Sequence, residues 1–64
     1  MKKKEIRRIA QQIVECENII ANSSDKSEIQ AAQGKILTLS RKFTSLDDML
    51  EVDALVQEMF EQKN

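Results

Sequence analysis

Apolar residues recur at steps of three and four positions in three separate stretches of the chain. In order, the stretches are Ile6, Ile9, Ile13, Cys16 and Ile20, then Ile29, Ala32, Ile36, Leu39 and Phe43, then Met49, Val52, Val56 and Met59. This spacing places side chains on one face of an α-helix. We therefore expect three amphipathic helices at about residues 3–21, 26–43 and 46–62.

Capping residues stand in the polar gaps between these stretches. Asp25 followed by Glu28 predicts a capping box at the start of the second helix. Ser45 is the expected N-cap of the third helix, and Asp47 and Asp48 follow in its first turn, where carboxylates suit the helix dipole. Both gaps are therefore predicted to be true breaks in the helix.

The stripes can be aligned as antiparallel neighbours with the chain reversing at each predicted break. Ile13 then lies opposite Ile36, and Ile36 lies opposite Val52. The expected fold is an all-α, up-down-up antiparallel three-helix bundle, with residues 1–64 forming a single helical domain. Its predicted layers are Ile6/Phe43/Leu46, Ile9/Leu39/Met49, Ile13/Ile36/Val52, Cys16/Ala32/Val56 and Ile20/Ile29/Met59.

An alternative fold joins the second and third helices into one. The chain would then be a helical hairpin or coiled coil that completes its core by dimerisation. A continued stripe from Phe43 would need apolar residues at positions 46, 50, 53 and 57. Leu46 and Leu50 comply, but Asp53 and Gln57 do not. This interruption favours the three-helix bundle.

Composition supports helices and removes most catalytic chemistry. The chain has one glycine and no proline, too few turn residues for a β-rich domain. With no histidine and a single cysteine, the usual zinc ligand sets and nucleophilic triads are missing, and no glycine-rich phosphate loop can form. We expect no enzyme activity, metal, cofactor or small-molecule ligand. Cys16, on a core stripe, is expected to be an inert core residue.

The location predicted for the chain is cytoplasmic. The basic start at Lys2, Lys3 and Lys4 resembles the head of a signal peptide, but Arg7 and Arg8 interrupt the apolar run that should follow. No stretch has the length of a membrane span, so no membrane association is expected. Small helical proteins of this kind are common among bacterial and phage reading frames, which indicates no particular function.

Several large apolar residues lie off the three core stripes. Val14, Leu37 and Leu50 point furthest from the expected core and are candidates for a partner or oligomer face. The alternative is that they are ordinary scattered surface residues. Because domains of this size have marginal stability as monomers, we expect these residues to take part in self-association.

A basic cluster is expected at one end of the bundle. It consists of Lys2, Lys3, Lys4, Arg7, Arg8, Arg41 and Lys42. The acids Asp47, Asp48 and Glu51 begin the third helix at the same end and could neutralise it internally. The other interpretation is contact with nucleic-acid phosphates. A net charge of −1 and a pI of about 5.3 favour internal neutralisation.

These observations predict a small non-catalytic helical protein–protein interaction module that forms a homo-oligomer. The alternative function is that of a nucleic-acid-binding accessory or regulatory protein that uses the basic end. Inhibition of another protein is a third possibility, for which no residue offers a sign.

Overall fold

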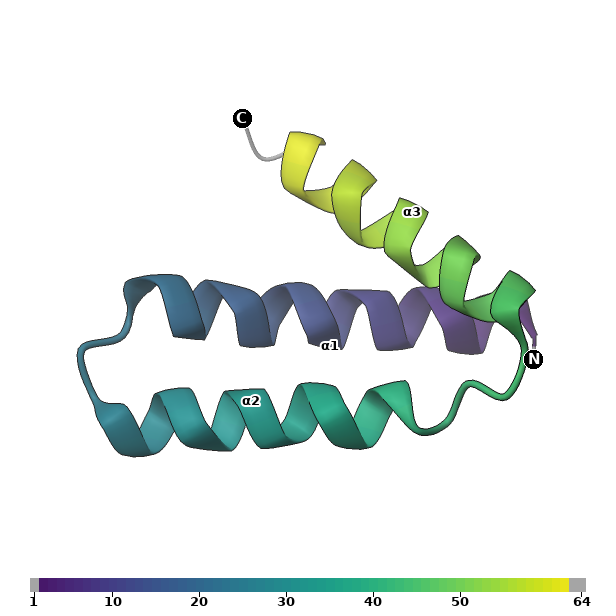
Figure 1. Ribbon diagram of the computed structural model, residues 1–64. Helices are drawn as coiled ribbons and strands as arrows, with labels where there is room; N and C mark the ends of the chain where they lie inside the picture. Colours follow the sequence, from purple (N-terminus) through teal and green to yellow (C-terminus); the bar gives the residue numbers. More distant parts are fainter. Residues whose placement is uncertain (1, 63–64) are drawn as a thin grey trace.

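The computed structural model describes residues 2–62, and in this range the chain forms three helices. They are α1 (Lys3–Asn22), α2 (Lys26–Ser40) and α3 (Leu46–Gln62) (Figure 1). The all-α three-helix bundle is confirmed. The chain breaks between α2 and α3, so the alternative with one continuous helix is not observed. In the described part of the chain, no helix is both long and apolar enough to span a membrane.

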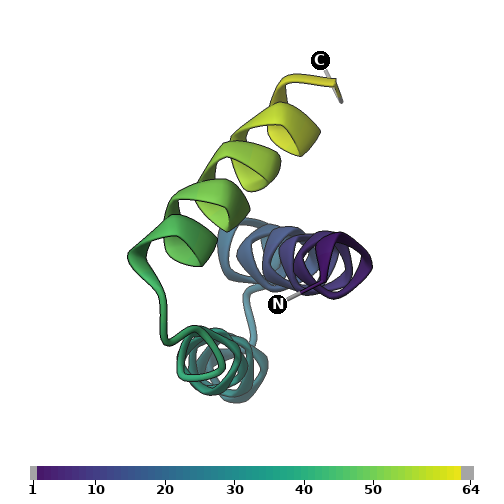
Figure 2. The ribbon, with the colours of Figure 1, turned by 90° about the vertical axis from the view of Figure 1, so that its right-hand side faces the viewer.

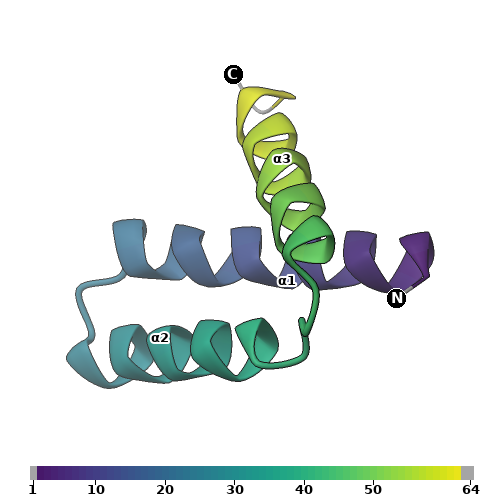
Figure 3. The same ribbon diagram turned by 45° about the vertical axis from the view of Figure 1, so that its right-hand side comes forward.

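The three helices do not pack equally against each other. α1 and α2 lie side by side and antiparallel, whereas α3 crosses α1 obliquely and moves away from α2 (Figures 1 and 2). The oblique crossing is clearest in Figure 3. α1 packs against both other helices, and α2 and α3 touch only slightly. α1 is therefore the central helix of the bundle.

Two adjacent apolar stripes on α1 explain its central position. Ile9, Ile13 and Cys16 form one stripe, and Ala10 and Val14 lie beside it at a spacing of four residues. All five are buried, and Ala10 is completely inaccessible to solvent. A helix with so wide an apolar face can bury itself against two neighbours. The small side chain of Ala10 leaves room for close approach of a neighbouring helix.

The buried core lies where the three helices meet. It consists of Ile6, Ile9, Ala10, Ile13, Leu39, Phe43 and Val52, with Leu55, Val56 and Met59 packed against it. Ile6 and Phe43, predicted to share a layer, share this core, and Cys16 and Ala32 are buried as expected.

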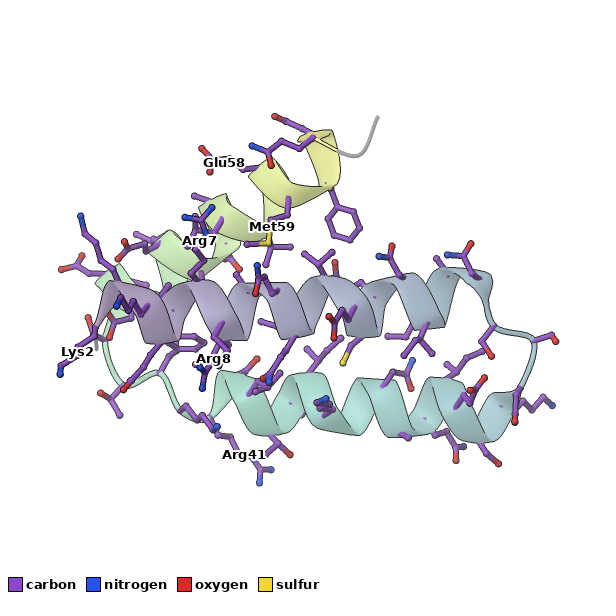
Figure 4. All side chains as sticks on the ribbon, turned by 180° about the vertical axis from the view of Figure 1, so that it is seen from behind. Lys2, Arg7, Arg8, Arg41, Glu58 and Met59 are labelled. Carbon is purple, nitrogen blue, oxygen red and sulfur yellow. The ribbon has the colours of Figure 1, made fainter. Side chains whose placement is uncertain are left out.

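The predicted layers fail where they depend on pairing between α2 and α3. Met59 was expected beside Ile20 and Ile29, but it lies between α3 and α1 (Figure 4). Leu46 and Met49 were expected in the core, but 70% and 41% of their surfaces are exposed. The reason is the oblique crossing of α3, which packs one part of its apolar side against α1 and leaves Leu46 and Met49 exposed to solvent.

The helix caps agree with the sequence in all but one detail. The Asp25 carboxylate accepts the Ser27 N–H at 2.9 Å. Glu28, however, does not complete the predicted capping box. Its carboxylate instead accepts the Ser23 hydroxyl at 2.7 Å, and the Asp25 N–H donates to the Ser23 hydroxyl oxygen at 3.1 Å. The Ser23 hydroxyl thus bridges the Asp25 N–H and the Glu28 carboxylate, which a capping box would join directly.

The second break lies slightly earlier than predicted, because α2 ends at Ser40 rather than at residue 43. The Thr38 and Ser40 hydroxyls donate to carbonyls one turn back, a side-chain bond that competes with regular helix geometry. Phe43 leaves the helix and enters the core from the connection. Ser45 caps α3 as predicted, since its hydroxyl oxygen accepts the Asp47 N–H at 3.2 Å.

The molecule is thin and more open than its mass requires. Its extents are 34 × 28 × 16 Å, and the shortest is little more than the diameter of one helix with its side chains, about 10–12 Å. It exposes 5060 Å², whereas a compact monomer of this mass exposes about 4,200 Å². The radius of gyration of 12.0 Å similarly exceeds the roughly 10.7 Å expected for 64 residues.

Candidate functional site

The divergence of α3 from α2 leaves a groove whose floor is α1. The groove encloses about 270 Å³. α1 contributes Ile13 and Glu17, α2 contributes Ile36 and Ser40, and the connection and α3 contribute Phe43, Met49, Val52 and Asp53. Most of these side chains are apolar, so the groove can accept another apolar side chain or helix face.

Four of the five most exposed large apolar residues belong to the two helices that form the walls of this groove. They are Leu37 at 64% exposure, Leu46 at 70%, Met49 at 41% and Leu50 at 59%. Leu37 follows the wall residue Ile36, and Leu46 and Leu50 flank Met49 at helical spacing. The groove residues and these four side chains together are called the open face below.

The candidate partner residues separate in the structure. Leu37 and Leu50 are exposed and belong to the open face. Val14 does not join them, because only 3% of its surface is exposed. Its place in the second apolar stripe of α1 explains this burial. The sequence-based grouping of Val14 with an outer surface is therefore wrong for the isolated chain.

Met49 and Leu46 were predicted to lie in core layers, so neither was expected at the surface. One signal was available. The apolar positions of α3 span more than half of a helical wheel, a wider arc than contact with one neighbouring helix can cover. One edge of that arc must stay exposed. The crossing direction of α3 relative to α1 decides which edge it is, and the alignment of the stripes did not predict that direction.

The open face has an acidic character. Glu17 is half-buried at the groove, and Asp53 is exposed at its edge. Neither carboxylate has a hydrogen-bond or ion-pair partner within residues 2–62. α3 carries six carboxylates and no basic residue between positions 46 and 62. A cationic side chain would therefore find favourable partners at this groove.

The seven basic candidates are all exposed, and the three arginine side chains among them point in different directions. Arg8 points from α1 toward the end of α2, where Arg41 extends into solvent (Figure 4). Arg7 instead points toward α3 (Figure 4). Within residues 2–62, no ion pair joins the cluster to Asp47 or Glu51, so close neutralising pairs with these acids are absent.

Two further hollows lie on other sides of the molecule. A shallow one of about 520 Å³ lies between α1 and the end of α3, beside Gln11 and Met59. Another of about 230 Å³ lies between α1 and α2, beside Cys16 and Lys35, and the thiol residue there is buried. Over residues 2–62, no group of three potential ligands is placed to hold a metal ion.

Comparison with known proteins identifies no relative of this chain. No family model, curated protein or solved structure matches the chain.

Proposed function

We propose that the protein is a small helical protein–protein interaction module and that it binds a second copy of itself through the open face. The observation that carries the proposal is the divergence of α3 from α2, which leaves an apolar groove lined in part by the exposed Met49, with three exposed leucines on the same two helices. An apolar groove on a small protein whose wall helices also expose large apolar side chains is typical of an interaction site.

The surface area supports a partner of about the same size. The chain exposes on the order of 800 Å² more than a compact monomer of its mass. A standard protein–protein interface buries about 800 Å² on each partner. A second copy is thus able to cover the excess and to stabilise a core that is small for an independent domain.

Light scattering over a concentration series tests the proposal. The wild-type mass should rise from 7.4 kDa toward twice that value as concentration increases. Leu50→Glu places a charge on the open face and should keep the chain monomeric. Leu50 is 59% exposed, so the variant is expected to fold normally.

Ile19→Glu is the matched control. Ile19 is also exposed, at 41%, but it lies beside the hollow between α1 and α2. This variant should associate like the wild type. A wild-type chain that remains strictly monomeric at high micromolar concentration would refute the proposal.

A further inference from the structure

We infer that α2 of a second copy occupies the groove, with its Leu37 in the apolar part and its Arg41 beside Asp53 and Glu17. The inference rests on the proposed self-association and specifies how the two copies recognise each other. Each α2 both borders its own groove and enters the partner's, so the arrangement closes around a twofold axis.

The groove has the chemistry to receive one apolar and one cationic side chain. Ile36, which is half-buried, and Met49, which is 41% exposed, provide most of its accessible apolar surface. Glu17 and Asp53 provide two carboxylates that have no partner within residues 2–62. A partner helix that brought a leucine without a positive charge would cover these carboxylates unpaired, which is costly.

α2 carries this pair of side chains at matching positions. Leu37 and Arg41 are four residues apart and therefore lie on the same side of the helix. Leu37 is 64% exposed. Arg41 points away from the bundle into solvent (Figure 4). Both are available to a partner without rearrangement of the fold.

The same charges argue against nucleic acid as the occupant. Phosphates brought to the groove would meet the carboxylates of Glu17 and Asp53, and α3 carries six carboxylates and no base over positions 46–62. Arg7 is turned toward that helix, and it does not add to a surface with Arg8 and Arg41 (Figure 4). A second copy matches both the apolar and the acidic parts of the groove.

Charge reversal tests the pairing by sedimentation equilibrium. Arg41→Glu and Asp53→Lys should each weaken dimerisation by about tenfold or more, the range seen for close charge pairs at interfaces. The two changes in one chain restore opposite charges across the interface and should recover most of the wild-type affinity. Lys26→Glu makes the same charge change at the far end of α2 and should have little effect.

Circular dichroism separates loss of association from loss of folding, and the mutated residues are exposed. A dimeric wild type that is indifferent to both reversals, or a double variant that recovers nothing, would overturn the inference while leaving self-association intact. A monomeric wild type would instead refute the proposed function. Binding of a short DNA duplex that Arg41→Glu abolishes would assign Arg41 to phosphate contact and would also overturn the inference.

Discussion

Ile36 of α2 and Val52 of α3 border the same groove, and they differ in how well they are covered. Val52 is buried against the core, with 4% of its surface exposed, whereas Ile36 is only half-buried. α1 covers Val52, but the departing α3 leaves Ile36 without a neighbour on one side. Apolar side chains in the covered part of the groove should therefore contribute more to the free energy of unfolding than Ile36 does.

A matched pair of substitutions measures this difference. Ile13→Val removes one methylene from the buried core and should destabilise the protein by about 0.5–1.5 kcal/mol. Ile36→Val removes the same group from a half-open site and should cost less than about half as much. Urea denaturation at a concentration where the chain is monomeric gives both values. Equal losses would contradict the divergence of α3 from α2.

The cap of α2 should contribute measurably to stability. Asp25→Ala removes the carboxylate that accepts the Ser27 N–H and should cost about 0.5–2 kcal/mol. Thermal unfolding followed by circular dichroism provides the measurement. Asp47→Ala is a suitable comparison, because Asp47 lies in the first turn of α3 without being its N-cap, and its loss should cost less. An unchanged midpoint for Asp25→Ala would contradict the assigned cap.

Gly34 offers a stabilising change. It lies within α2, has no positive φ angle, and a Cβ atom built there meets no other atom within 4 Å. Gly34→Ala should therefore raise the free energy of unfolding by about 0.5–1 kcal/mol through helix propensity alone. Chemical denaturation would show the gain as a higher midpoint. A loss of stability would mean that this position packs closely against something outside the isolated chain.

Cys16 should be protected in the native protein. Only 3% of its surface is exposed, between α1 and α2. A thiol reagent should modify it at least about tenfold more slowly in buffer than in denaturant, because reaction requires local opening. Rapid modification of the folded protein would contradict the packing of α2 on α1.

Much of the fold could be predicted from the chain because local signals agreed with each other. The stripe from Ile6 to Ile20 and the caps at Asp25 and Ser45 each depend on short-range physics, and they gave the three helices and both breaks. The docking of α3 is a long-range choice. Its wide apolar arc can pack on α1 or on α2, and the stripe pattern alone does not decide between them.

The same long-range choice decided which candidate site residues were exposed. Leu37 and Leu50 were predicted correctly as surface residues, because they lie far from every core stripe. Val14 was expected outside the core and is buried, and Met49 was expected in the core and is exposed, because both depend on how α3 docks. The positions of the basic residues along the chain predicted that they gather at one end of the bundle. The apolar stripes did not predict the direction in which each basic side chain points.

A dilution series of two-dimensional NMR spectra tests whether the open face binds a second copy. Amide resonances of residues 36–41 and 46–53 should shift or broaden as concentration rises from micromolar to millimolar. Those beside Cys16, Ile19 and Ala31, which border the opposite hollow, should stay unchanged. Spectra that are independent of concentration, or changes confined to the Ile19 side, would show that the open face does not bind a second copy.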